Sequence, residues 1–300
     1  MIEQPAEVTV RGPDAPGRVP DTPRRTREQG SWIHIRGGRG WGSGLREVWQ
    51  YREVFYFLAW RDIKVRYRQS VFGISWALFQ PLLLMLVFAA FVRILHAKTT
   101  SGVPYPVFAL AALVPWTLFS QSLTTSSESL VREANVVSKV FFPRVILPLA
   151  STAAFLLDFV ISLALLLVLM LAYSVYPTPN ALLLPLFTVL ALLVSLSVGV
   201  LLAALNAMYR DVRAVVPFLA QVWLFASPVA YSSSLVPHRW QFVYSLNPMV
   251  AVIDGFRWSL LGVGSPSVTM LLVSGAAAIA LLVGSLAYFR RANHVFADVI

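Results

Sequence analysis

The stretch Leu182–Met208, LLLPLFTVLALLVSLSVGVLLAALNAM, decides the fold class because it contains no charged residue. A helix of about 20 apolar residues spans the hydrocarbon core of a bilayer. Helical hydrogen bonding also satisfies every backbone polar group within the segment, as the absence of water there requires. The stretch therefore predicts a transmembrane α-helix.

Five other segments are also long and predominantly apolar, although one of them holds Asp158 and another ends at Arg93. They lie at about residues 71–93, 103–127, 145–176, 214–231 and 267–289. Hydrophobic residues make up 57% of the chain and charged residues only 13%, with a mean hydropathy of +0.69. A soluble protein carries about a quarter charged residues. We therefore expect an all-α, polytopic membrane protein with six transmembrane helices.

The N-terminal part divides into two regions. Residues 1–44 are rich in Pro, Gly, Arg and Asp and lack apolar periodicity, which predicts a disordered cytoplasmic tail without a cleavable signal peptide. Residues 45–70 carry apolar side chains at helical spacing and predict an amphipathic helix on the inner membrane face. Its charged end contains Arg61, Asp62, Lys64, Arg66 and Arg68. Membrane anchoring and contact with a cytoplasmic partner are both open for this helix.

Residues 235–262 interrupt their apolar runs with charges, which predicts two short re-entrant or interfacial helices on the outer side. Asn247 followed by Pro248 is typical of an N-cap and a first helical residue. Asp254 and Arg257 stand three apart on the second helix, so we expect them to pair. A seventh complete span is the alternative, but it would bury this pair in lipid.

Basic residues set the orientation. With six spans and a cytoplasmic N-terminus, twenty Lys and Arg residues lie inside and four lie outside. This bias follows the positive-inside rule and predicts that both termini are cytoplasmic, at the inner membrane. It also explains the net charge of +10 without a nucleic-acid partner.

The residues that support catalysis are sparse. The chain has no cysteine, its histidines are far apart, and none of its three lysines follows a glycine. These facts predict no thiol or metal site and no phosphate-binding P-loop. Asp158 is the only clear charge inside a predicted span, and we expect it to pair with a hydroxyl or amide, with a proton relay as the alternative. If a membrane protein of this kind is a transporter, the missing P-loop means that its energy should come from another chain.

The cytoplasmic loop Glu128–Pro148, ESLVREANVVSKVFFPRVILP, mixes charges with many apolar side chains. Apolar surface on an aqueous side is typical of a docking site. A helix that rests on lipid headgroups is the alternative.

Four segments together resemble one family. They read RDIKVRYRQSVFGISWALFQPLLLMLVFAAF, VPYPVFALAALVPWTLFSQSLTTSSESLVREANVVSKVFFPRVILPLA, NAMYRDVRAVVPFLAQVWLFASPVAY and LNPMVAVIDGFRW. From about residue 45 to the C-terminus the chain resembles the permease subunit of type-2 ABC exporters. These exporters move lipid-linked polysaccharides such as O-antigen and teichoic acid.

The resemblance implies two permease copies and two ATPase subunits, with ATP and Mg on the ATPase and no cofactor on this chain. It makes residues 45–70 the interface helix and residues 131–144 the coupling segment that docks on the ATPase. The implied docking residues are Glu133, Asn135, Val136, Lys139, Val140, Phe141 and Arg144. The implied outer gate helices contain Asn247, Pro248, Asp254, Arg257 and Trp258.

The same resemblance implies a glycan route between the two permease copies, partly lined by aromatic rings, on which sugars stack. The candidate lining residues are Trp76, Phe79, Trp116, Phe119, Asp158, Trp223 and Phe225. Packing inside the protein or at the membrane interface is the alternative for each aromatic residue.

Three other functions remain open from the sequence. A type-2 ABC exporter of drugs or small lipids has a similar outline and would not depend on polymer synthesis. A membrane enzyme of glycan assembly would be active as a single purified chain. An ion-coupled carrier would show proton sensitivity centred on Asp158.

Overall fold

The computed structural model describes residues 48–68, 75–94, 102–140 and 142–292, and no β-strand occurs among them. The expected all-α class is confirmed for this part of the chain. The predicted tail at residues 1–44 lies outside the described residues.

Seven α-helices make up the bundle. They are α3 (Ser75–Ile94), α4 (Tyr105–Arg132), α6 (Ile146–Ala154), α7 (Leu156–Ala172), α8 (Leu184–Met208), α9 (Val212–Ala226) and α12 (Val268–Ala292). Four described stretches are long and apolar enough to cross a membrane: Tyr105–Arg132, Ile146–Ala172, Pro179–Met208 and Val268–Ala292. Two shorter apolar helices, Leu78–Ile94 and Val212–Ala226, fall in the other two predicted spans. The described part of the chain thus contains several apolar helices of the kind that a polytopic membrane protein has.

Helix α4 is the centre of the bundle. Most of its residues are buried, and it packs against α3, α6, α7, α8, α9 and α11 (Pro248–Leu261). Its Ser-rich second half allows close approach, because a Cβ placed on Gly199 of α8 would lie 2.9 Å from Cβ of Ser126. Small residues let membrane helices pack closely and form hydrogen bonds between helices. Asn206 of α8 accordingly donates from Nδ2 to the carbonyl of Ser127 at 2.8 Å.

The third predicted span is broken into two helices. Helix α6 ends at Ala154, Phe155 lies between, and α7 begins at Leu156. The break places Asp158 in the first turn of α7 rather than in a helix interior. The free N–H groups of a helix N-terminus favour an anionic side chain there.

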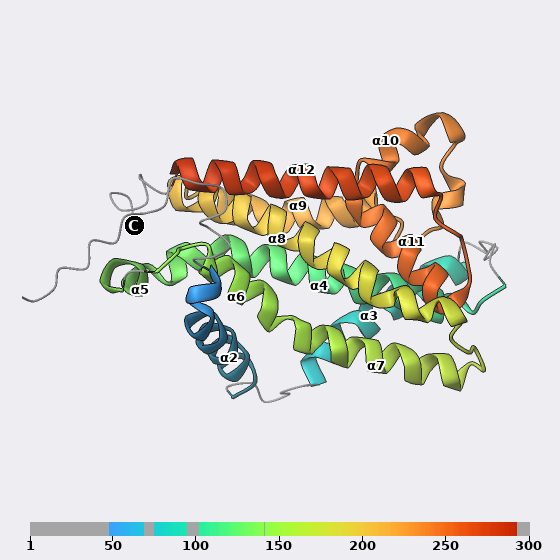
Figure 1. Cartoon of the computed structure of the whole chain (residues 1–300). Helices are drawn as coiled ribbons and strands as arrows, with labels where there is room; N and C mark the ends of the chain where they lie inside the picture. The colour runs from blue at the N-terminus through green and yellow to red at the C-terminus, as the bar shows by residue number, and fades with distance from the viewer. Residues whose placement is uncertain (1–47, 69–74, 95–101, 141, 293–300) are drawn as a thin grey trace, which may run out of the picture. The chain divides into compact units, whose positions relative to one another are not determined.

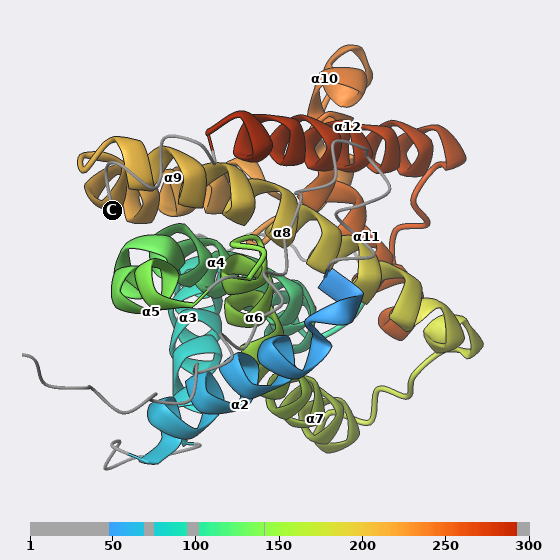
Figure 2. The ribbon, with the colours of Figure 1, turned by 60° about the vertical axis from the view of Figure 1, so that its left-hand side comes forward.

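The bundle has two distinct ends (Figure 1). At one end lie α2 (Arg52–Arg68) and the short α5 (Ala134–Lys139), where α2 crosses the direction of the long helices beside α6 (Figures 1 and 2). At the other end lie α11 and α10 (Gln241–Ser245), and α10 projects from the bundle beyond α12 (Figure 2).

Three short 3-10 helices complete the described elements: Pro179–Leu183, Ser233–Leu235 and His238–Trp240. The first precedes α8, and its neighbour Thr178 donates from Oγ1 to the carbonyl of Ser259 at 2.7 Å. This bond ties the connection between α7 and α8 to the last turn of α11.

Two predicted boundaries differ from the described helices by five residues. Helix α4 continues to Arg132, five residues past the predicted span, so it leads directly into the coupling segment. Helix α9 ends at Ala226 instead of Tyr231, because the sequence Ser227-Pro228 cannot continue a helix.

Candidate functional site

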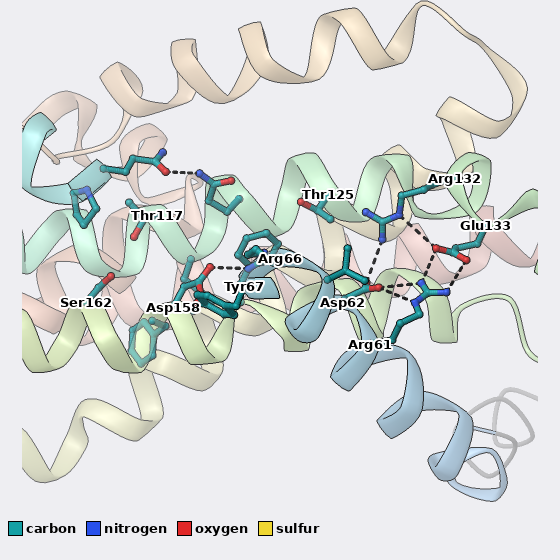
Figure 3. A pocket seen from close by; sticks show the side chains of 17 residues that line it. Arg61, Asp62, Arg66, Tyr67, Thr117, Thr125, Arg132, Glu133, Asp158 and Ser162 are labelled. Atoms are coloured by element: carbon teal, nitrogen blue, oxygen red, sulfur yellow. Dashed lines mark hydrogen bonds and ion pairs between the residues drawn. The ribbon is translucent and has the colours of Figure 1, made fainter. Parts of the chain in front are cut away.

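Helix α2 is joined to the start of the coupling segment by charged side chains (Figure 3). The Arg61 guanidinium donates to both carboxylate oxygens of Glu133, at 2.9 and 2.6 Å, and to Asp62 at 2.9 Å. Arg132 donates to the other oxygen of Asp62 at 3.1 Å. Hydrogen bonding to Glu133 raises the pKa of Arg61 although burial opposes the shift. Glu133 lies between the end of α4 and the start of α5, so these bonds connect all three helices.

A second set of bonds joins the end of α2 to α7. Arg66 donates to Asp158 at 2.6 Å, and the Tyr67 hydroxyl donates to the other oxygen of that carboxylate. Burial and the bond to Asp158 raise the pKa of Tyr67. The Arg66 guanidinium also lies 3.6 Å from the ring centre of Phe155, the residue between α6 and α7.

The expected partner of Asp158 is therefore only partly correct. A hydroxyl does bind it, but the main partner is the cation of Arg66. A charge that appears isolated along the sequence is thus neutralised by a helix about 90 residues earlier.

A cavity of about 700 Å³ lies between these two sets of bonds (Figure 3). Its wall includes the ion pairs together with neutral polar side chains from α3, α4 and α7: Gln80, Thr117, Gln121, Thr125 and Ser162. Gln121 donates to Gln80 at 2.8 Å, which links α4 to α3. We call this cavity and the two sets of bonds beside it the inner junction. Its wall is polar, and its three arginines are balanced by three carboxylates.

The coupling segment is only partly free for docking. Glu133 is engaged with Arg61, Val136 is half-buried against the inner core, and Phe142 is buried there. Asn135, Lys139 and Val140 are exposed, Arg144 is half-buried, and Phe141 lies outside the described residues. Burial lowers the pKa of Arg144. Val131 and Val140, 46% and 54% exposed, supply apolar surface at this end.

The residues of the predicted interface helix also include both exposed and buried side chains. Lys64 and Arg68 are exposed, whereas Leu58 is buried in a cluster with Leu130 of α4 and Ile146 of α6. The exposed side also carries Trp49, Tyr56, Phe57 and Trp60. Exposed positions of α2 therefore carry aromatic as well as basic side chains, and within this chain the helix does not divide cleanly into one polar and one apolar face.

The aromatic candidates for the route fall into two groups. Trp116 and Phe119 are buried, and the Phe119 ring packs against Trp223 with ring centres 5.0 Å apart. Trp223 is half-buried and donates to Asn247 at 2.9 Å. Phe79 and Phe225 are exposed, and the side chain of Trp76 lies outside what the structure describes. Within one copy of the chain, Trp116 and Phe119 belong to the core.

The predicted start of the second gate helix is confirmed. The Asn247 side chain accepts a hydrogen bond from the backbone N–H of Met249 at 3.1 Å, and Pro248 is the first residue of α11. Every residue of α11 except Trp258 is buried. The helix ends at Gly262, whose φ of 70° is a left-handed conformation that favours glycine.

The predicted pairing of Asp254 with Arg257 is wrong. Among the described residues no ion pair within 4 Å involves Arg257. Instead its guanidinium donates to the carbonyl oxygens of Phe108, Pro228, Val229 and Tyr231, at 2.6 to 3.3 Å. Three of these carbonyls follow the end of α9, where Pro228 stops helical hydrogen bonding. Arg257 therefore holds the broken end of α9 to α11 and α4.

Sequence reasoning missed three participants in the inner junction. Tyr67, Arg132 and Gln121 were not singled out, although all three line the cavity. The sequence does show that Asp62, Arg66 and Tyr67 gather near the end of one predicted helix. Their partners lie on other helices, which spacing along α2 does not reveal.

Comparison with known proteins gives one consistent result. Residues 53–261 match the sequence profile of the family described as ABC-2 type transporter. The chain is 31% identical over 258 residues to an O-antigen export system permease protein of Myxococcus xanthus, covering 85% of this chain and 98% of the relative. It is 24% identical over 243 residues to an O-antigen export system permease protein of Klebsiella pneumoniae, covering 80% and 92%. It is 26% identical over 238 residues to a polysialic acid transport protein of Escherichia coli, covering 77% and 90%.

Proposed function

The chain belongs to the ABC-2 type transporter family, and from this premise we propose that it is the permease subunit of an ATP-driven exporter of a lipid-linked polysaccharide or oligosaccharide. The main support for this substrate class is the similarity to an O-antigen export permease over 98% of that relative's length. The polysialic acid transport protein supports the same class of cargo, since its name also specifies a polysaccharide.

We place the energy source on a partner. The sequence has no Gly-Lys pair, so it lacks the lysine of a P-loop that binds nucleotide phosphates. Two ATPase subunits would bind ATP and Mg, and this chain would bind no cofactor and catalyse no reaction. Closure of the ATPase pair would move the coupling segments and shift the permease between conformations.

The proposed topology has six spans at the inner membrane, with both termini cytoplasmic. Helices α3, α4, α6–α7, α8, α9 and α12 supply the spans. Helix α9 has 15 residues, or about 22 Å at 1.5 Å per residue, so Ser227–Tyr231 would complete its path across the core. Twenty basic residues on the inner side against four outside support this orientation.

The permease would act as a homodimer with the glycan route between the two copies. Exposure favours Phe79 and Phe225, 55% and 64% exposed, as aromatic residues on such a route. Trp116 and Phe119 would support it from the core.

Docking through residues 131–144 gives the sharpest test of this proposal. Val140 is an exposed apolar residue at the C-cap of α5. If its side chain is buried in the complex with the ATPase, the substitution Val140→Asp should weaken binding by about 2 kcal/mol or more. The matched control is Ser265→Asp, which adds the same charge at an exposed position on the proposed outer side.

The measurement is co-purification with the cognate ATPase, followed by ATP hydrolysis and export of a lipid-linked oligosaccharide in proteoliposomes. We expect Val140→Asp to reduce binding, Ser265→Asp to leave it intact, and the permease alone to hydrolyse no ATP. Normal binding by Val140→Asp would reject the docking assignment. ATP hydrolysis by the permease alone would reject the assignment of the ATPase to a partner chain. Export of small lipids but not of the glycan would favour the alternative cargo.

A further inference from the structure

We propose that Arg66 and Asp158 form a positioning link through which α2 passes movement of the coupling segment to the membrane helix α7. The proposal rests on the function proposed above and assigns a role to residues that docking alone leaves unexplained. The link has an inner attachment, a stiff connection and an outer attachment.

The inner attachment joins α2 to the coupling segment. Arg61 binds both oxygens of Glu133, and such a two-bond contact fixes direction as well as distance. The Glu133 and Asp62 side chains are only 12% and 13% exposed and Arg61 is 30% exposed, so solvent screens these bonds in part and less than it would on an open surface. Because Glu133 directly precedes α5, a displacement of α5 pulls on Arg61.

The connection is the α-helix itself. Arg61 and Arg66 are five residues apart, about 7.5 Å along an α-helix, within the continuous helix Arg52–Arg68. Backbone hydrogen bonding makes so short a helical segment stiff, so the two arginines move together.

The outer attachment lies at the break between α6 and α7. Arg66 binds Asp158 in the first turn of α7 and stacks on Phe155 at the break, and Tyr67 binds the second oxygen of Asp158. A break in a helical path is a place where one part can tilt against the other. The link is therefore attached where α7 is easiest to reorient.

The cavity supplies room for that movement. It is bordered by α2, α4 and α7, so the first turn of α7 faces open volume instead of close-packed side chains. Close-packed interfaces resist continuous deformation, and a cavity removes this resistance.

The charges favour a mechanical role over binding of an anionic ligand. Arg61, Arg66 and Arg132 line the cavity, and each has a carboxylate oxygen within 3.1 Å. An anion entering the cavity would compete with Glu133, Asp158 and Asp62. Three cations and three anions leave no excess positive charge to attract it.

The test compares Arg66→Gln and Asp158→Asn with the matched control Arg52→Gln, which removes an exposed cation from the same helix. The readouts are assembly with the ATPase, the rate of ATP hydrolysis, and glycan exported per ATP hydrolysed. We expect both link variants to assemble and hydrolyse ATP while export per ATP falls on the order of tenfold, as loss of a charge-assisted bond predicts. Arg52→Gln should match the wild type.

A charge exchange separates linkage from general stabilisation. The double variant Arg66→Asp with Asp158→Arg restores opposite charges and should recover part of the lost export per ATP. Unchanged export per ATP in the single variants would overturn the proposal. Proportional loss of hydrolysis and export, with no recovery by exchange, would also overturn it and leave the pair a stabilising contact.

A second readout needs no cargo, so it is independent of the proposed glycan. The sequence has no cysteine, which allows spin labels at single introduced cysteines. Labels at the exposed positions Val168 on α7 and Leu272 on α12 should report a distance change between nucleotide-free and ATP-bound complexes. We expect Asp158→Asn to abolish this change. A wild-type distance change without glycan export would refute the cargo but not the link, whereas an unaltered change in the variant would refute the link.

Discussion

The two ends of the molecule use arginine in opposite ways. At the end formed by α2 and α5, Arg61 and Arg66 are 30% and 28% exposed in their side chains and bind carboxylates from other helices. At the end formed by α10 and α11, Arg257 is 2% exposed and binds main-chain carbonyl oxygens and the face of Phe108. Arg61 and Arg66 bind side chains, which can follow a movement of α2. Arg257 instead binds main-chain carbonyls that follow the end of α9, and the carbonyl of Phe108 in α4.

This difference indicates that the side-chain contacts of α2 can move together with the helix, whereas α11 is fixed. The two gate helices then have different characters. Helix α11 is part of the core, whereas α10 projects from the bundle with Phe242, Val243 and Leu246 exposed (Figure 2). Movement at the outer gate would therefore belong to α10, with α11 as its support.

The largest expected effect comes from removing the outer arginine. Arg257→Ala would leave the carbonyls of Phe108, Pro228, Val229 and Tyr231 without this donor and would open a cavity in the core. Unmet buried hydrogen-bonding groups cost about 1–3 kcal/mol each, so we expect a destabilisation of several kcal/mol. Thermal unfolding in detergent and the amount of protein in the membrane would measure it. Arg239→Ala, at an exposed position, is the control, and equal stability of the two variants would contradict a fixed clamp.

An intermediate effect is expected at the contact between α11 and α8. A Cβ on Gly255 would lie 2.2 Å from the ring of Phe187, which is itself buried. Gly255→Ala should therefore cost about 1–3 kcal/mol of stability through overpacking. The second substitution Phe187→Leu should recover part of it by removing ring atoms. If Gly255→Ala unfolds at the wild-type temperature, α11 can shift and is not a rigid support.

The smallest expected effect concerns the inner ion pair. A double-mutant cycle of Arg61→Gln and Glu133→Gln should give a coupling free energy of about 1 kcal/mol, since the guanidinium is partly exposed. Raising the salt concentration should reduce this coupling, whereas the cost of Arg257→Ala should be insensitive to salt. If the coupling free energy does not change with salt, Arg61 is held as rigidly as Arg257.

Long apolar runs predicted where the apolar helices lie, four of which are long enough to cross a membrane, because the absence of water in a bilayer requires such runs to be helical. The start of α11 was also predictable, because an Asn cap and a following proline act within a few residues. Helix boundaries were less accurate where tertiary packing extends a helix, as at the end of α4.

The polar contacts between helices were not predictable in the same way. Spacing allowed Asp254 to meet Arg257, but spacing does not say that the broken end of α9 would offer carbonyl oxygens to the same cation. Asp158 appeared isolated because its partners Arg66 and Tyr67 precede it by about 90 residues. Trp116 and Phe119 resembled route-lining aromatics, and only the packing of α4 among six helices places them in the core.

The equal numbers of opposite charges around the inner cavity have an electrical consequence. Moving one elementary charge through a membrane potential of 100 mV involves about 2.3 kcal/mol of work. Arg66 and Asp158 are bound to each other, so their joint displacement transfers no net charge across the field. A cell could let its membrane voltage rise or fall without helping or opposing this movement.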